Sequence, residues 1–179
     1  ERDFFIQDNS KPSLIMFSQN INLLDPVRLN RCLRVMTVPE VRWTHRDIKT
    51  TQLLAASLIK TDAKANGFDD AWFVENGYVT EGTSSNAFIV IENKKIITCR
   101  ISTNILAGVT RFSIVETAKF LGFEVEERPF SVEEAELANE AFITSATNFI
   151  ASVVEINGIL IGSGVVGPVT KSLRNQYLS

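Results

Sequence analysis

A lysine and a glutamate in this sequence occupy positions where side chains are well placed for chemistry. Lys49 comes directly before a helical pattern, at the end of an element, where functional groups gather. Glu81 lies near a buried apolar run at 87–91, so its carboxylate needs a cation or hydrogen-bond donors. Lys49 is thus placed where a functional group could lie, and Glu81 is a candidate for holding a proton on a ring nitrogen. The simpler interpretations are an exposed lysine beside a helix start, and an ion pair of Glu81 with Arg42, Arg46 or Arg111.

A third segment has the features of an anion site. Gly108-Val109-Thr110-Arg111 stands at the predicted start of a helix, where backbone N–H groups without helical partners bind phosphate. Thr110 is expected to cap this helix, and a simple N-cap explains that residue equally well.

Apolar spacing and turn residues predict the elements that position these groups. A three-to-four spacing predicts a helix over 50–66 that Gly67 ends, and Asn76-Gly77 predicts a hairpin before Glu81. Strands are predicted at 14–17 (short and buried), 32–38, 70–74, 78–80, 88–91, 96–99, 123–128, 141–144, 149–155 and 159–161. Further helices are predicted at 111–121, from Ser131 by a capping box, and at 170–177. Hairpins with scattered helices predict an α+β (mixed α/β) fold.

Length and composition limit the classes of protein. With 179 residues, 45% of them hydrophobic, the chain can bury a substantial core, and one domain is the default. A net charge of −3 without a basic block argues against a nucleic-acid partner, and the lack of an apolar run of about 18 residues argues against a membrane span. One histidine without a Cys/His/Asp cluster predicts no metal site. Cys32 and Cys99 are expected to be reduced core thiols of a cytoplasmic protein.

Five short blocks occur in an order that is typical of one family. They are DIKTT at 47–51, TEGTSSN at 80–86, LAGVTR at 106–111, EAFITSATN at 140–148 and GPVT at 167–170. Together they resemble the class IV (fold-type IV) pyridoxal-phosphate aminotransferases, which include D-amino acid transaminase, branched-chain aminotransferase and aminodeoxychorismate lyase. The resemblance implies the large C-terminal domain of such an enzyme at 14–179. Residues 1–13 would be an interdomain linker or the end of a small N-terminal domain that is otherwise absent.

The resemblance also implies a role for each candidate site residue. Lys49 would bind the aldehyde of pyridoxal 5'-phosphate covalently, after burial near the cationic cofactor lowers the pKa of its amine, and then move the substrate proton. Glu81 would keep the pyridine nitrogen protonated. Leu106 would pack on the ring, and the phosphate would be bound by Val109, Thr110, Thr144, Ser145, Ala146 and Thr147. Asn86 and Ser84 would hold Glu81, although both could equally be turn residues. The family often has threonine where Ala146 stands, so one hydroxyl contact would be lost.

The activity that the resemblance implies is transamination between an amino acid and a 2-oxo acid, in a homodimer. Arg2 favours D-amino acids, because it aligns with an arginine that receives the substrate carboxylate, although the histidine that follows in that motif is lost. The alternatives are transamination of branched-chain L-amino acids or (R)-amines, aminodeoxychorismate lyase activity, and a non-catalytic paralogue. The last would be expected to lose Lys49 or Glu81, and this chain keeps both.

Overall fold

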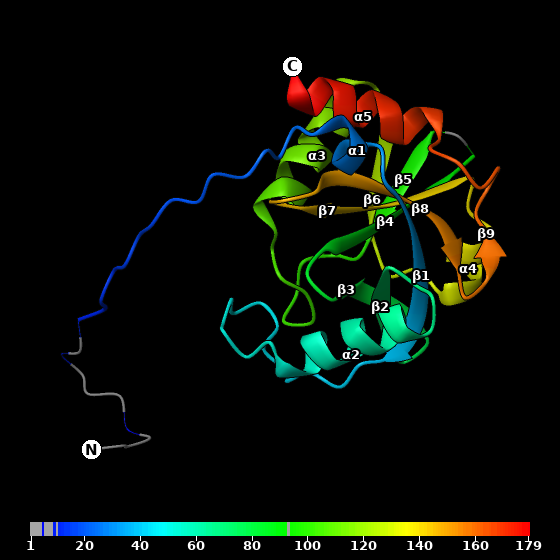
Figure 1. Ribbon diagram of the computed structural model, residues 1–179. Coiled ribbons are helices and arrows are strands. Elements are labelled where there is room, and N and C mark those ends of the chain that lie inside the picture. Colours follow the sequence, from blue (N-terminus) through cyan, green and yellow to red (C-terminus); the bar gives the residue numbers. More distant parts are fainter. Residues whose placement is uncertain (1–4, 6–8, 10, 93) are drawn as a thin grey trace.

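The computed structural model describes residues 5, 9, 11–92 and 94–179. The strands are β1 (Cys32–Pro39), β2 (Asp70–Glu75), β3 (Tyr78–Gly82), β4 (Asn86–Ile91), β5 (Lys95–Thr98), β6 (Glu124–Glu127), β7 (Glu140–Ser145), β8 (Phe149–Ile156) and β9 (Ile159–Leu160). They form one sheet with the order β3-β2-β1-β8-β7-β4-β5-β6, and β9 pairs with β8 (Figure 1). Pairs β1–β2, β1–β8 and β5–β6 are parallel and the others antiparallel, which confirms the predicted mixed class.

The central strands are apolar on both faces because each face is covered. Along β4, Ala87 and Ile89 belong to one core cluster and Phe88 and Val90 to another, as the two-residue period of a strand requires. The rings of Phe88 and Phe142 stack across β4 and β7 at 4.8 Å. This double burial explains why 88–91 reads as a continuous apolar run.

Five helices lie around the described sheet (Figure 1): α1 (Pro26–Leu29), α2 (Leu54–Ala65), α3 (Val109–Phe120), α4 (Val132–Glu136) and α5 (Pro168–Leu178). α3 and α5 pack side by side on the face that carries Phe88, where Ile114 and Leu173 join its cluster. α2 packs on β2 at the other end of the molecule, with Ala63 against Phe73. Ser131 caps α4 as the capping box predicts, since its hydroxyl accepts from the Glu134 N–H.

The two ends of the sheet meet, so the sheet curls. Tyr78 in β3 bridges Ser131, which follows β6, and the Val79 N–H donates to the Phe130 carbonyl at 3.0 Å. Phe130 is fully buried and packs edge-on against Trp72, with ring centres 6.2 Å apart. This closure presents the turn between β3 and β4 to the same side as the start of α3.

A buried carboxylate fastens α5 to the centre of the sheet. Glu140 in β7 accepts the N–H groups of Val169 and Thr170 at 2.8 Å each, and the Thr170 hydroxyl at 2.7 Å. A Cβ on Gly167 would stand 2.0 Å from the Glu140 carboxyl carbon, so only glycine fits there. These contacts join the sequence blocks at 140–148 and 167–170, and they satisfy the first N–H groups of the helix.

The structure contradicts three expectations about local structure. Leu14 to Phe17 form no strand, and each side chain is 81% to 84% exposed, because no described strand lies beside this segment. Cys32 is a free thiol like Cys99, but it is exposed because it lies on the outward side of β1. The helix predicted over 50–66 begins at Leu54. No helix in the described ranges is both long and apolar enough to cross a membrane.

Candidate functional site

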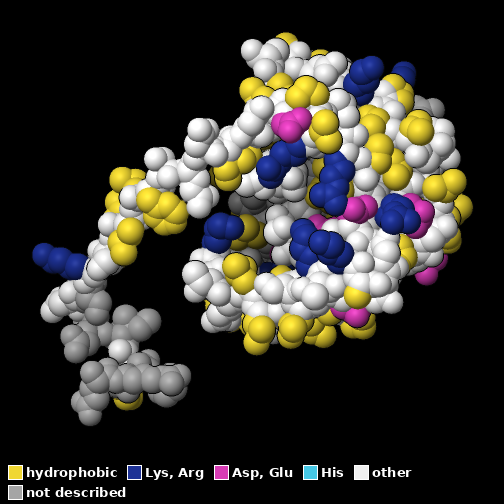
Figure 2. Space-filling view, viewed as in Figure 1, with side chains coloured by type: hydrophobic (Ala, Val, Ile, Leu, Met, Phe, Trp, Pro, Cys, Tyr) yellow, Lys and Arg dark blue, Asp and Glu magenta, His cyan; other side chains and the backbone are white. Residues whose placement is uncertain are grey.

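A cavity of about 780 Å³ opens between the loop before α2, the β3–β4 turn, the start of α3 and the end of β7. In Figure 2 this face is hollowed, and Lys and Arg side chains gather around the hollow. The predicted site residues that line the cavity include Lys49, Glu81, Asn86, Leu106, Val109, Thr110, Ser145 and Ala146. Arg2, the predicted substrate contact, lies outside the described residues.

Glu81 is a buried carboxylate that lines this cavity. It is 4% exposed on β3, and its Oε2 accepts the Leu106 N–H at 3.0 Å and the Asn86 side-chain amide at 3.2 Å. Its Oε1 accepts from Arg42 Nη1 at 2.8 Å. The ion pair considered as an alternative for Glu81 is therefore present, with Arg42 as the partner, and both carboxylate oxygens have donors.

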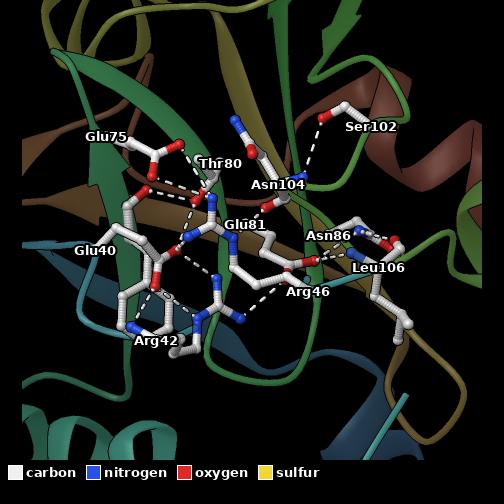
Figure 3. A network of polar contacts seen from close by, with 11 residues as sticks. Glu40, Arg42, Arg46, Glu75, Thr80, Glu81, Asn86, Ser102, Asn104 and Leu106 are labelled. Carbon is white, nitrogen blue, oxygen red and sulfur yellow. Dashed lines mark hydrogen bonds and ion pairs between the residues drawn. The ribbon is translucent and has the colours of Figure 1, made fainter. Parts of the chain in front are cut away.

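The Arg42 contact is part of a larger network (Figure 3). Arg42 donates from Nε and Nη2 to the Glu40 carboxylate at 2.9 and 2.6 Å. Arg46 lies 3.5 Å from the same carboxylate and donates to Glu75 at 3.0 and 3.2 Å. The Thr80 hydroxyl completes the set by donating to Glu40 at 3.3 Å. The loop that leads to Lys49 is thus anchored to β2 and β3 by charged hydrogen bonds.

Burial and charge act in opposite directions on the two carboxylates that contact Arg42. Burial raises the pKa of Glu81 above its ordinary 4.5, and the charge of Arg42 with the Leu106 N–H opposes this rise without cancelling it. Burial would also raise the pKa of Glu40, but its hydrogen bonds with Arg42 outweigh burial and hold the pKa below 4.5. Arg42 therefore stabilises the charged form of Glu40 more effectively than that of Glu81. As pH falls, Glu81 takes up a proton before Glu40 does.

Lys49 also lines the cavity, but in a different setting. Its side chain is exposed in the loop before α2, and its amine has no hydrogen bond or ion pair to any described residue. The amine is free to react with whatever occupies the cavity.

The start of α3 also lines the cavity, where its first backbone N–H groups could bind an anion. Its N-cap is Gly108, and no side chain caps the helix, so the prediction that Thr110 caps it is wrong because the helix begins at Val109, one residue earlier. The first N–H groups of a helix have no partner within it. A Cβ on Gly108 would stand 2.3 Å from Asn86 Oδ1, so the absence of a side chain lets the helix start lie against the Glu81 end.

Two buried hydroxyl groups along the cavity lack partners among the described residues: Ser85 Oγ and Thr144 Oγ1. Buried hydroxyl groups are normally hydrogen-bonded, so they indicate a polar group in the cavity. With the open α3 start they fit a phosphate, while Glu81 fits a basic ring nitrogen and Lys49 an aldehyde. The residues present therefore fit pyridoxal phosphate.

Arg42 and Ser85 line the cavity but were not among the predicted site residues, whereas Thr144, predicted as a phosphate contact, does line it. The sequence held a signal for both missed residues, because Arg42 was a possible partner of Glu81 and Ser85 lies within a recognised block. Their burial and partners depend on contacts between distant segments, which spacing alone does not reveal. Ser145, in contrast, already uses its hydroxyl to accept the Asn148 N–H at 3.1 Å.

Comparison with known proteins identifies one family. A family model described as amino-transferase class IV matches residues 1–156. D-alanine aminotransferase from Bacillus licheniformis is 38% identical over 148 residues, covering 80% of this chain and 52% of that protein. A protein of Aquifex aeolicus named as a probable branched-chain-amino-acid aminotransferase is 40% identical over 126 residues, covering 69% of this chain and 40% of that protein.

A solved structure shares the fold as well. The branched-chain amino acid aminotransferase from Thermobaculum terrenum, in its PLP-bound holo form, superposes with a TM-score of 0.76 at 31% identity. The match covers 87% of this chain and 52% of that one. The chain thus spans about half the length of the relatives that it matches.

Proposed function

We propose, since this chain belongs to the class IV amino-transferase family, that it provides the cofactor-binding part of a pyridoxal-phosphate-dependent aminotransferase. The enzyme moves an amino group between an amino acid, with D-amino acids favoured, and a 2-oxo acid. Residues 14–179 form the cofactor-binding domain, and residues 1–13 are a linker or the end of a smaller domain. The protein acts in the cytoplasm as a homodimer.

The observation that carries this proposal is the meeting of Lys49 and Glu81 at one cavity, although they lie on different elements. An amine and a buried carboxylate that line one cavity are the two groups that pyridoxal phosphate requires of its protein. The Ser85 and Thr144 hydroxyl groups and the open start of α3 add donors for a phosphate.

Each residue has a definite task in this reaction. When bound, pyridoxal phosphate would supply a ring that accepts the electron pair left on the substrate Cα when the Cα–H bond breaks. The Lys49 amine binds the cofactor aldehyde, and once the substrate amine displaces it, this amine carries the proton away from and back to the substrate. Glu81 holds the proton on the ring nitrogen, and Asn86 orients Glu81. Arg2 receives the substrate carboxylate.

A D-amino acid substrate is supported by Arg2 and by the match with D-alanine aminotransferase. Transamination of branched-chain L-amino acids is the second candidate, and the similar identity to the Aquifex aeolicus protein favours it. (R)-amine transamination, aminodeoxychorismate lyase activity and a non-catalytic paralogue are further alternatives on the same scaffold.

The cofactor assignment is tested by borohydride reduction of the full-length protein after loading with pyridoxal phosphate. We expect a yellow protein whose reduced cofactor remains attached to the peptide that contains Lys49. Lys49→Ala should leave no attached cofactor. Lys171→Ala, which changes an exposed lysine on α5, should retain it. A reduced adduct in the Lys49→Ala protein would refute the assignment.

The substrate is tested with a panel of D- and L-amino acids and 2-oxoglutarate. We expect turnover of D-amino acids, and Arg2→Gln should raise KM for them more than it lowers kcat, because Arg2 contributes to binding. Turnover of branched L-amino acids alone would replace the first candidate with the second.

A further inference from the structure

A buried cluster of charges lies at the Glu81 end of the cavity. It contains three carboxylates, of Glu40, Glu75 and Glu81, and two guanidinium groups, of Arg42 and Arg46 (Figure 3). N–O distances from 2.6 to 3.5 Å join all five side chains. Those of Glu40, Arg46 and Glu81 are 3%, 3% and 6% exposed, so water screens their charges little. The cluster has one negative charge in excess, which a cation in the cavity would balance.

Arg42 is held rigidly where it contacts Glu81. The Glu40 carboxylate binds its Nε and Nη2 atoms, and the guanidinium carbon lies 4.0 Å from the centre of the Phe73 ring. Paired hydrogen bonds and a cation–π contact fix the orientation of a guanidinium. Its third nitrogen, Nη1, then donates to Glu81 Oε1 at 2.8 Å. Arg46 forms no hydrogen bond or ion pair with Glu81 in the described part of the chain, and its Nε donates to the Asn104 carbonyl at 2.9 Å.

We infer that Arg42 is a positioning residue that keeps the Glu81 carboxylate charged and thereby leaves a shared proton on the ring nitrogen of the cofactor. This inference rests on the proposed function, in which Glu81 faces that nitrogen. Arg42 acts through Glu81 and touches neither the substrate nor the reacting bonds.

The proton balance shows why Arg42 matters. Glu81 and the ring nitrogen share one proton, so the pair is either a carboxylate with a protonated ring or a carboxylic acid with a neutral ring. Both arrangements have the same total charge, but burial favours the neutral one. The Arg42 cation, 2.8 Å from Oε1, stabilises the carboxylate and reverses that preference. A neutral ring is a much weaker electron sink.

Other charged groups near Glu81 do not replace Arg42. Arg111 lines the cavity, but it donates to the Cys99 carbonyl and to Glu127, both at 2.7 Å. Cys99 is buried, and burial raises the pKa of its thiol, so it stays neutral. Lys49 is committed to the cofactor aldehyde in the proposed function. Arg42 is thus the cation of the described chain that is placed to set the charge of Glu81.

The test measures ring protonation rather than turnover. Full-length wild-type protein, Arg42→Gln, Arg42→Lys and Arg128→Gln are loaded with pyridoxal phosphate labelled with ¹⁵N in the ring, and the nitrogen shift is recorded. Affinity for pyridoxal phosphate is also compared with that for its 1-deaza analogue, which cannot take the proton. Arg128 is the matched control, because it also binds two carboxylates, those of Glu126 and Glu134, away from the cavity.

We expect a protonated ring in the wild type and in Arg128→Gln, and a largely neutral ring in Arg42→Gln. The preference for pyridoxal phosphate over the deaza analogue should fall by about tenfold or more in Arg42→Gln, since a neighbouring opposite charge shifts proton binding by that order. Arg42→Lys, which keeps the charge, should restore most of the preference.

The outcomes separate this inference from the proposed function. An unchanged nitrogen shift in Arg42→Gln overturns the inference, while failure of the wild type to bind pyridoxal phosphate overturns the proposed function. If circular dichroism shows that Arg42→Gln is unfolded, Arg42→Met, which keeps an apolar side chain beside Phe73 and removes the charge, replaces it. An unchanged nitrogen shift and an unchanged preference for pyridoxal phosphate in that variant would refute the inference.

Discussion

The two sides of the cavity differ in how completely the fold prepares them. Glu81 lies on a strand, is 4% exposed, and accepts hydrogen bonds from Arg42, Asn86 and Leu106. Lys49 lies in a loop with its side chain exposed and its amine without a partner among the described residues. The folded chain therefore fixes the Glu81 carboxylate in place, whereas no described residue fixes the Lys49 amine.

This difference follows from the chemistry assigned to each side. A group that stabilises charge works best when its donors are fixed beforehand, because no reorganisation is then needed during the reaction. A group that forms and breaks a covalent bond, and then carries a proton, must be able to move. Variants at each side should therefore differ in how much they change the stability of the fold.

The largest effect is expected for Glu81→Ala. The change removes the acceptor for three buried donors and leaves Arg42 with Glu40 alone, so the free energy of unfolding should fall by about 3 kcal/mol. Urea unfolding followed by circular dichroism measures this loss. Glu116→Ala, at an exposed glutamate of α3, should change it by less than about 0.5 kcal/mol. Equal losses in the two proteins would show that the Glu81 side is not coupled to the fold.

A smaller loss is expected for Gly108→Ala. The new Cβ would displace Asn86, whose amide donates to Glu81 and to the Leu106 carbonyl, at a cost of about 2 kcal/mol. Gly122→Ala is the control, because that glycine has a φ of +81° in open space and should cost about 1 kcal/mol. Gly108→Ala alone should also weaken binding of pyridoxal phosphate in a fluorescence titration. Tight binding by this variant would argue against the helix start as the phosphate site.

The pH dependence of stability should separate Glu81 from Glu40. Burial raises the pKa of Glu81 in the folded chain, so the stability of the wild type relative to Glu81→Gln should fall as pH rises above about 4.5. The hydrogen bonds with Arg42 keep the pKa of Glu40 low despite burial. Its contribution should therefore be present above about pH 4.5 and be lost as pH falls below that value. Urea midpoints of the wild type, Glu81→Gln and Glu40→Gln, measured from about pH 3 to pH 7, test these opposite slopes. The prediction is contradicted if the stability differences of the two variants from the wild type change in the same direction with pH.

The smallest effect on stability is expected for Lys49→Ala in the absence of cofactor. An exposed side chain without partners contributes little, so the free energy of unfolding should change by less than about 0.5 kcal/mol. A thermal melt of the unloaded protein checks this. A loss above about 1 kcal/mol would mean that Lys49 has a structural contact, and the contrast between the two sides would disappear.

Sequence reasoning predicted the elements whose signals are local. The hairpin at Asn76-Gly77 and the capping box at Ser131 both occur, because turn and cap preferences depend on neighbouring residues. The parallel pairing of β1 with both β2 and β8 was not predicted, since it joins segments far apart in the chain. The expected buried strand at 14–17 was wrong for the same reason, because burial requires a neighbour that an apolar run does not specify.

Prediction of the site had a similar limit. The order of the five blocks identified residues that line the cavity, including Lys49 and Glu81. It did not reveal that Arg42 binds both Glu40 and Glu81, because that network depends on how the loop after β1 approaches β3. Nor did it reveal the unpartnered Ser85 and Thr144 hydroxyl groups, which appear only after the turn and the strand end are buried together.

The exposed segment from Leu14 to Phe17 has a practical consequence for work on this chain. Four consecutive apolar side chains without proline or charge make a segment that readily adds to the edge of another sheet. The solubility of these 179 residues alone should therefore be limited by pairing of this segment between molecules, and not by unfolding of the core. Placing lysine at Ile15 and Phe17 should raise solubility and leave the melting temperature unchanged.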